Sequence, residues 1–251
     1  MNTFGLSDKG RHRAENQDCF DLCSVKSGTL AVVCDGMGGV AGGLLASELA
    51  AGRFLAFART ALETAEGAVS DSTEVEDILR QATDAANRKV YRFAGQTEEY
   101  NGMGTTLVAG YWQDDTAYFV NVGDSRAYRI AKDGIMQITK DHSLVQQMID
   151  RGEITPAQGR QHPRRNIITR AVGSERFVTC DIFSIPIREG DCYLLCSDGL
   201  TNAVEEAELH RVILAAENAE AACRTLVNEA IENGARDNVT AVVVYNGKGD
   251  A

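Results

Sequence analysis

Four aspartates stand at the ends of strand-like apolar runs, and they are the residues best placed to do chemistry: Asp35, Asp124, Asp198 and Asp237. Asp is also common in turns, so each one taken alone has a purely structural explanation. Together with Asp18 they form a set that contains no His or Cys, and oxygen-only ligands favour Mg²⁺, Mn²⁺ or Ca²⁺ over zinc. The joint pattern therefore predicts a site for hard cations.

Such a site supports attack of water on phosphorus. If the five carboxylates converge, their mutual repulsion requires cations to neutralise it. Two ions about 3.5–4 Å apart hold and deprotonate a bridging water. Gly36 follows Asp35, and its carbonyl can approach a metal because no side chain obstructs it. Arg13 lies in the polar loop before Asp18 and offers a planar fork to phosphoryl oxygens, although an exposed loop arginine needs no such role.

The glycine-rich stretch after Asp35 also has the spacing of a dinucleotide-binding turn, with Gly36, Gly38 and Ala41 between a strand-like run and a helical pattern. No acidic residue closes a second strand about 20 residues later, so that fingerprint is incomplete. No Lys-Ser or Lys-Thr follows for a P-loop, and no G-x-S-x-G elbow is present. The pattern favours phosphoryl chemistry over these alternatives.

The composition is that of an ordinary globular protein of 251 residues, 44% of them hydrophobic. This length suits a single domain, 1–251, and with only three prolines no Pro-rich linker divides it. A formal net charge of −11 argues against nucleic-acid binding. No apolar run approaches the ~20 residues of a membrane span, and no apolar signal core opens the chain. Seven scattered cysteines fit a reducing compartment, so a cytoplasmic location is expected.

The elements that must position these aspartates follow from hydrophobic periodicity. Strands are expected at 3–8, 19–25, 30–34, 105–111, 116–122, 125–130, 135–138, 180–185, 191–196 and 238–245. Helices are expected at 44–62, 75–93, 205–216 and 219–233, with two short helices in 142–161. Strands in blocks and helices in pairs differ from the alternation of a parallel sheet. They indicate an α+β fold in which sheets pack together under helices.

Six motifs occur in order along nearly the whole chain. They are Arg13-x-x-Asn16-Gln17-Asp18, Asp35-Gly36-Met37-Gly38-Gly39, Gly104-Thr105-Thr106, Val122-Gly123-Asp124-Ser125-Arg126, Ser197-Asp198-Gly199-Leu200 and Asp237-Asn238-Val239-Thr240. This set resembles the metal-dependent type-2C protein serine/threonine phosphatases, in particular the short bacterial form. The resemblance implies a four-layer α-β-β-α sandwich of two antiparallel sheets flanked by paired helices.

The resemblance also implies roles for the aspartates in a site with two Mg²⁺ or Mn²⁺ ions and a third, weaker ion. Asp35 would bridge the first two ions, and Gly36 would contribute its carbonyl. Asp198 and Asp237 would bind the first metal. Asp124 would frame the third ion together with Asp198.

Further residues would support these ligands. Asp18 would hold a metal-bound water, Asn238 would stand behind the ligands, and Arg13 would grip the substrate phosphate. The stretch 143–168 would be a mobile flap subdomain beside the cleft. It carries most of a basic cluster (Arg160, Arg164, Arg165 and Arg170), which is either a solvated loop surface or a docking site for acidic or phosphorylated partners.

The activity implied by the resemblance is hydrolysis of phosphoserine and phosphothreonine by a metal-bridging hydroxide. The expected partners are phosphorylated proteins, made by a serine/threonine kinase, and the expected state is a monomer. Two alternatives remain open: a catalytically weak relative that binds phosphoproteins, and a phosphatase for small phosphoesters. Met37 stands where animal members carry a histidine proposed as general acid. Val40 and Gly43 depart from the His and Glu of many bacterial relatives.

Overall fold

Two antiparallel sheets form the centre of the protein, as seen in a computed structural model that describes residues 1–64 and 71–247, with the side chains at 40 and 41 not described. One sheet has the strand order β1-β11-β10-β7-β8, and the other has the order β2-β3-β5-β6-β9 with β4 paired to β3. The strands are β1 (Asn2–Asp8), β2 (Asp18–Val25), β3 (Gly28–Met37), β4 (Gly104–Thr105), β5 (Leu107–Gln113), β6 (Thr116–Val122), β7 (Arg126–Ala131), β8 (Gly134–Gln137), β9 (Asp181–Pro186), β10 (Cys192–Cys196) and β11 (Val239–Tyr245).

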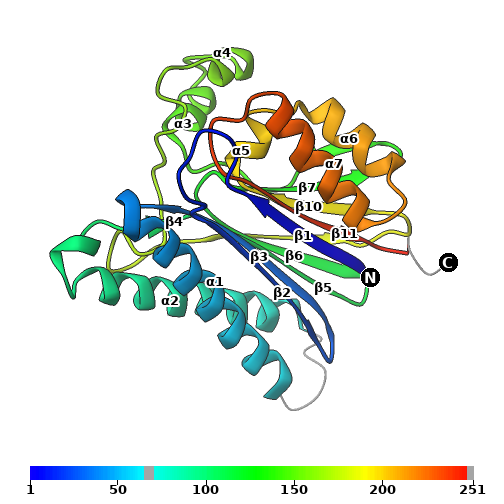
Figure 1. The fold of residues 1–251 in the computed structure, drawn as a ribbon. Coiled ribbons are helices and arrows are strands. Elements are labelled where there is room, and N and C mark those ends of the chain that lie inside the picture. The colour runs from blue at the N-terminus through cyan, green and yellow to red at the C-terminus, as the bar shows by residue number, and fades with distance from the viewer. Residues whose placement is uncertain (65–70, 248–251) are drawn as a thin grey trace.

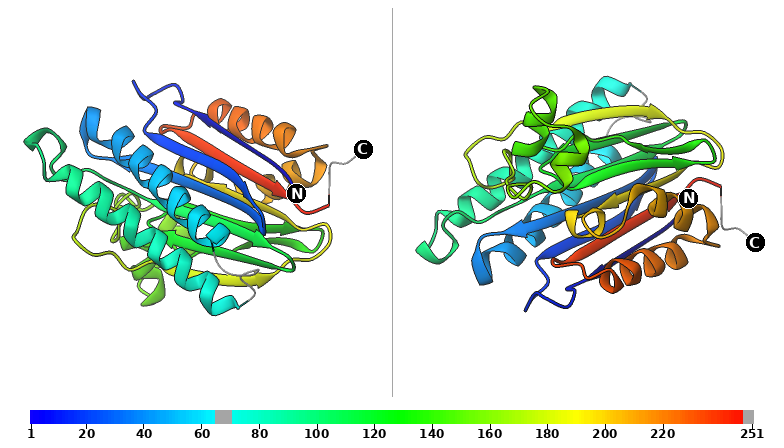
Figure 2. Two further views of the ribbon diagram at one scale, coloured as in Figure 1. Left: turned by 90° about the horizontal axis from the view of Figure 1, so that it is seen from below. Right: turned by 90° about the horizontal axis from the view of Figure 1, so that it is seen from above.

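Helices cover both outer faces of the paired sheets (Figures 1 and 2). The helices are α1 (Gly39–Thr64), α2 (Ser72–Ala94), α3 (Leu144–Asp150), α4 (Pro156–Arg160), α5 (Asp198–Thr201), α6 (Glu206–Ala215) and α7 (Ala219–Glu232), with a 3₁₀ turn η1 (Glu98–Tyr100). α1 and α2 lie on the six-stranded sheet, and α6 and α7 lie on the five-stranded sheet. The expected α+β class and four-layer sandwich are confirmed.

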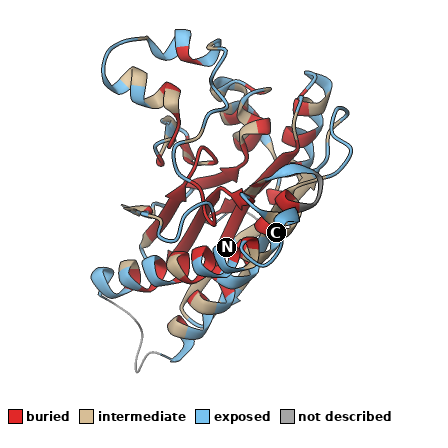
Figure 3. Cartoon of the chain, turned by 90° about the vertical axis from the view of Figure 1, so that its left-hand side faces the viewer, coloured by how far each residue is buried: buried red, intermediate tan, exposed pale blue. Residues whose placement is uncertain are grey.

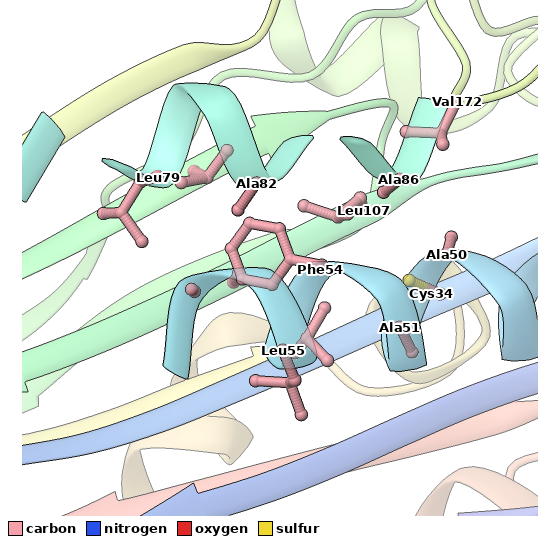
Figure 4. Close-up of a cluster of buried hydrophobic side chains, with 14 of the residues drawn as sticks. Cys34, Ala50, Ala51, Phe54, Leu55, Leu79, Ala82, Ala86, Leu107 and Val172 are labelled. Atoms are coloured by element: carbon pink, nitrogen blue, oxygen red, sulfur yellow. The ribbon is translucent and has the colours of Figure 1, made fainter. Parts of the chain in front are cut away.

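Strands at the centre of the sandwich are buried on both faces, which explains their continuous apolar runs. Because successive side chains of a strand point to opposite faces, Leu194 packs under α6 and α7 while Leu195 packs between the sheets. A third core lies under α1 and α2, where Phe54 of α1 meets Leu79 and Leu107 (Figure 4). Coloured by burial, the central strands such as β5 and β10 are red, and the outward sides of the helices are largely pale blue (Figure 3).

The start of α1 differs from its expected place. β3 continues through Asp35 and Gly36 to Met37, where the sequence predicted a turn directly after residue 34. Gly36 stays in the sheet because it pairs with Thr105 of β4. The turn is made instead at Gly38 and Gly39, whose φ angles of +130° and +75° suit glycine. Residues 39–43, expected as a loop, therefore form the first turn of the helix. η1 and α5 were not predicted.

The segment 143–168, which contains α3 and α4, projects from the sandwich (Figure 1). Its two ends meet at its base, where Ser143 bridges Ile168 and the Leu144 N–H donates to the Ile167 carbonyl at 2.8 Å. The segment is thus closed at the point where it leaves the body of the protein.

In the two described ranges, no helix combines the length and the apolar character that crossing a membrane requires.

Candidate active site

Two acidic residues face each other across neighbouring strands of the six-stranded sheet. β2 and β3 pair antiparallel in a register that places Asp18 opposite Asp35. Directly opposed residues share one face of a sheet, with Cβ atoms about 4.5–5.5 Å apart. The backbone of Asp35 is held on its other side by Thr106. The Asp35 N–H donates to Thr106 Oγ1 at 2.9 Å, and the Asp35 carbonyl accepts from the Thr106 N–H at 2.9 Å.

The five-stranded sheet contributes two further carboxylates. Asp198 begins α5 shortly after β10, and Asp237 lies two residues before β11. Because β10 and β11 are antiparallel neighbours, the end of β10 and the start of β11 meet at one edge of the sheet. Asp198 Oδ2 accepts from Asn202 Nδ2 at 3.0 Å, and Asp237 Oδ1 accepts from the Asn238 N–H at 2.9 Å.

Asp18 joins the two sheets. Its Oδ2 accepts from Ser197 Oγ at 2.7 Å and from Thr240 Oγ1 at 2.6 Å. Ser197 directly precedes Asp198, and Thr240 belongs to β11. The Asp18 carboxylate therefore fixes the backbone that carries Asp198, in addition to facing Asp35.

Asp124 lies in the turn between β6 and β7 and is only 9% exposed. The next residue, Ser125, places its Oγ 2.7 Å from Thr106 Oγ1. Thr106 is also the residue that holds the backbone of Asp35. One buried threonine thus connects the Asp35 strand with the Asp124 turn.

The five residues Asp18, Asp35, Asp124, Asp198 and Asp237 form a carboxylate cluster. Burial, helped by the charges of the other four members, holds the pKa of Asp35 well above its usual range. Burial likewise raises the pKa of Asp18 to about 7, that of Asp124 to about 8 and that of Asp198 to about 6. These carboxyl groups come from separate parts of the chain and act on one another electrostatically.

The protein supplies little positive charge to the carboxylate cluster. Among residues 1–64 and 71–247, the one basic side chain that forms an ion pair with a member of the cluster is Arg13. Its Nη2 lies 2.6 Å from Asp237 Oδ2. The charge of Arg126 opposes the rise in the pKa of Asp124 and Asp198 without cancelling it, and the Arg126 guanidinium is already paired with Asp141, with Nη2 2.7 Å from Oδ2. The cluster therefore carries an excess of negative charge when it ionises.

The donor atoms fit a hard divalent cation. Asp18 Oδ1 and Asp198 Oδ1 are buried and have no hydrogen-bond partner among the described residues. A buried carboxylate oxygen without a donor is costly, and a cation removes that cost. No three acidic, histidine or cysteine side chains of the described chain already form a complete metal-binding group. The fit therefore rests on the charge and chemistry of the oxygen donors.

Arg13 contacts an acidic residue of the cluster, although the resemblance assigned it to phosphate alone. Its side chain is 54% exposed, so solvent reaches the guanidinium beside Asp237. Asn238 holds the loop that carries Arg13. Its Nδ2 donates to the carbonyls of Lys9 and Glu15, each at 3.0 Å, and its Oδ1 accepts from the Gln17 N–H at 2.9 Å.

Close packing between β3 and α1 explains Gly36 at the end of the strand and Gly43 in the first turns of the helix. A Cβ atom at Gly36 would lie 2.0 Å from the carbonyl oxygen of Gly43. A Cβ atom at Gly43 would lie 2.4 Å from Gln17 Oε1 and 3.0 Å from the Gly36 carbonyl. The departure at Gly43 therefore lets α1 approach β3 closely. The side chain of Val40, the other departure, lies outside the described residues.

Two open cavities flank the carboxylate cluster. One, of about 660 Å³, is lined by Asp124 and Asp198, by the segment 143–168 and by the region of α5 and α6. The other, of about 410 Å³, is lined by Arg13, by the glycine-rich end of β3 and by Asn238. The larger cavity thus exposes two members of the carboxylate cluster, Asp124 and Asp198, to its interior.

Residues 9–233 match the sequence model of the family Protein phosphatase 2C. The chain belongs to this family. It is 38% identical over 242 residues to Serine/threonine phosphatase stp of Listeria innocua, covering 95% of this chain and 93% of that protein. It is 34% identical to Protein phosphatase PhpP of Streptococcus pneumoniae, covering 98% of each.

A solved structure agrees with the sequence comparison. The crystal structure of Serine/threonine phosphatase Stp1 from Staphylococcus aureus superposes with a TM-score of 0.89 at 34% identity, covering 99% of this chain and 96% of that one. The expected family, its short bacterial form and the class of phosphoprotein phosphatase are therefore confirmed.

Sequence reasoning missed the hydroxyl groups that hold the carboxylates in place. Thr106 and Thr240 lie inside motifs that were singled out, and Ser197 opens the motif of Asp198. Small hydroxyl residues in the motifs that contain the candidate aspartates were a usable signal. Their partners are distant in sequence, so no spacing rule could have assigned the contacts.

Proposed function

We propose that this protein is a Mg²⁺- or Mn²⁺-dependent phosphatase that acts on phosphoserine and phosphothreonine in proteins. The observation that carries this proposal is the carboxylate cluster, buried at the sheet edges with too little positive charge to balance it. The family of the chain supports the reaction class, and the names of its relatives support the substrate residues.

Asp35, Asp198 and Asp237 would hold the two main ions, with the Gly36 carbonyl beside them, and Asp124 would hold a third, weaker ion together with Asp198. Bound Mg²⁺ or Mn²⁺ supplies an acidified water for attack on phosphorus and offsets the phosphoryl charge.

The chain's own residues then orient the reactants. The guanidinium N–H groups of Arg13 donate hydrogen bonds to two phosphoryl oxygens and so position the phosphorus for in-line attack. Asp18 fixes the backbone at Ser197 through Oδ2 and leaves Oδ1 free to orient a water. Asn238 holds the loop that presents Arg13.

The remaining expectations also belong to this proposal. The segment 143–168 would act as a flap over the larger cavity, where Arg160 and Arg165 contribute to the wall and can meet acidic or phosphorylated chains. The substrates would be proteins modified by a serine/threonine kinase, and the enzyme would work as a monomer in the cytoplasm. The cysteines expected to be reduced, Cys19, Cys23, Cys34, Cys180, Cys196 and Cys223, carry free thiols in the described chain, which fits a reducing compartment.

Turnover is expected to depend on added metal. Protein stripped with a chelator should release phosphate from a phosphothreonine peptide at a background rate, and Mn²⁺ or Mg²⁺ should restore release. The small phosphoester p-nitrophenyl phosphate is the control substrate. A higher kcat/KM for the phosphopeptide than for this small phosphoester would support proteins as the substrates. Full activity in chelator-treated protein would contradict the metal dependence, and absence of turnover with both substrates and both metals would favour a binding protein.

Replacing Arg13 by alanine is expected to lower kcat/KM by roughly 10–150-fold, because a hydrogen bond to a charged group is worth about 1.5–3 kcal/mol. Lysine at this position keeps a cation but loses the planar guanidinium, so the kcat/KM of Arg13→Lys should lie between those of the wild type and Arg13→Ala. Arg11→Ala, an exposed arginine of the same loop, is the matched control. Calorimetric metal titration separates the roles: weaker metal binding in Arg13→Ala would show that Arg13 acts through Asp237 and not on phosphate.

A further inference from the structure

The turn that presents Asp124 depends on the residue before it. Gly123 has φ +108°, a conformation that other residues rarely adopt, and a Cβ atom there would lie 2.6 Å from Thr106 Cγ2. The turn is thus tightly confined on the side of Thr106. What holds its other side determines where the Asp124 carboxylate points.

His142 holds that side with two hydrogen bonds to one residue. The Gly123 N–H donates to His142 Nδ1 at 3.1 Å, and the His142 N–H donates to the Gly123 carbonyl at 2.8 Å. The same carbonyl also accepts from Asn121 Nδ2 at 3.2 Å. Both backbone groups of Gly123 are therefore satisfied, and within residues 1–64 and 71–247 the acceptor for the Gly123 N–H is the imidazole of His142.

The far nitrogen of the ring is anchored to another part of the protein. His142 Nε2 lies 3.1 Å from Asp181 Oδ2, and Arg170 Nη1 lies 3.1 Å from Nε2 and donates to Asp181 Oδ1 at 2.8 Å. Because Nδ1 accepts a hydrogen bond, Nε2 carries the proton and donates to Asp181. Burial lowers the pKa of His142, which agrees with a neutral ring that is 7% exposed.

The same residue stands at the base of the segment 143–168. It directly precedes that segment, and its carbonyl accepts from the Thr169 N–H at 2.7 Å just after the segment ends. Arg170 then turns back to Asp181, beside the ring. Both ends of the segment are thereby tied to the residue that holds the Asp124 turn.

We propose that His142 is a positioning residue that fixes the Asp124 turn through Gly123 and ties it to the base of the segment 143–168. This inference rests on the proposed role of Asp124 in turnover. In the described chain, the hydrogen bonds of the His142 ring go to Gly123, Asp181 and Arg170, none of which is proposed as a metal ligand. Its effect is to keep the Asp124 carboxylate in one orientation.

Two amide substitutions distinguish the role of Nδ1 from that of Nε2 in the His142 ring. In His142→Asn the amide oxygen takes the place of Nδ1 and still accepts from Gly123, while the link to Asp181 is lost. In His142→Gln the amide reaches the place of Nε2, and Gly123 loses its acceptor. His210→Ala is the control, because His210 is partly buried and bonds the Ala131 carbonyl at 2.9 Å away from this turn.

Three measurements are made on each folded variant: hydrogen exchange of the Gly123 amide by NMR without metal, kcat and KM with Mn²⁺, and the melting temperature. His142→Gln is expected to expose the Gly123 amide to faster exchange and to lower kcat by roughly 10–100-fold, the usual cost of removing a group that orients a ligand, with KM within about twofold. His142→Asn should keep the amide protected and recover kcat to within about threefold, as rescue through Nδ1 requires. His210→Ala should keep wild-type kcat.

A double mutant tests the route. If His142 acts through Asp124, adding His142→Gln to Asp124→Ala should change kcat little, because coupled residues are not additive. The inference would be overturned if the double mutant lost kcat additively, or if His142→Asn and His142→Gln lost kcat equally. It would also be overturned if the Gly123 amide exchanged at the wild-type rate in His142→Gln. If Asp124→Ala is impaired while His142→Gln is not, this inference alone fails. If Asp124→Ala turns over like the wild type, the proposed role of Asp124 fails, and the inference fails with it.

Discussion

Asp198→Asn is expected to lower metal-dependent phosphate release by at least ~10²-fold, the usual loss on removing one preorganised electrostatic group, and to leave the protein folded. Asp198 Oδ1 is buried, and no group in residues 1–64 and 71–247 forms a hydrogen bond to it, so it can meet a cation. Asn202 Nδ2 bonds only the other oxygen, at 3.0 Å. An amide of the same shape keeps the packing but removes the charge that a divalent ion needs.

The same substitution is expected to stabilise the metal-free protein above pH 6. The pKa of Asp198 is raised to about 6 by burial, so its ionised form costs free energy in the fold at neutral pH. Activity and metal-free stability should therefore change in opposite directions, which ordinary loss of packing cannot produce. Thermal melts and phosphopeptide turnover measure both, with the exposed Asp133→Asn as control. Near-normal turnover at saturating metal would show that Asp198 is only a turn former.

The metal-free protein is expected to lose stability as pH rises from about 5 to 8. The folded pKa values of about 6, 7 and 8 for Asp198, Asp18 and Asp124 lie above that of an unfolded aspartate, so the folded state binds more protons in this window. The unfolding free energy therefore falls with rising pH. A hundredfold higher proton affinity at one group amounts to about 2.7 kcal/mol, or roughly 5–10 °C in Tm for a chain of this size.

Mg²⁺ or Mn²⁺ should remove this loss, because bound cations compensate the ionised carboxylates. Melting curves at pH 5.5, 7 and 8, each with chelator or with metal, measure the effect. Asp18→Asn is a second test. Its amide oxygen can still accept hydrogen bonds from Ser197 and Thr240, so the metal-free Tm of the variant should depend less on pH than that of the wild type. A metal-free Tm that is constant or rises between pH 5.5 and 8 would contradict the electrostatic account of the cluster.

Much of the fold was predictable because local periodicity reports burial. The apolar run of β10 and the helical spacing of α2 reflect which faces are covered, and both elements lie within a few residues of their expected bounds. The start of α1 was missed because five glycines between residues 36 and 43 resemble a loop in composition. Only the close approach of Gly43 to Gly36 shows that a helix needs those glycines there.

By itself, the sequence determined the family, the order of the motifs and the acidic residue types at the ends of apolar runs. Each of these properties depends on residues that are close together in the sequence. The tertiary structure decided which groups touch: Asp18 with Ser197 and Thr240, Arg13 with Asp237, and His142 with Gly123. All but the last of these contacts join residues more than 170 positions apart, and even the last spans 19. They exist only because two packed sheets bring distant strand ends to one edge, where hydrogen-bond distance is set by packing and not by spacing in the chain.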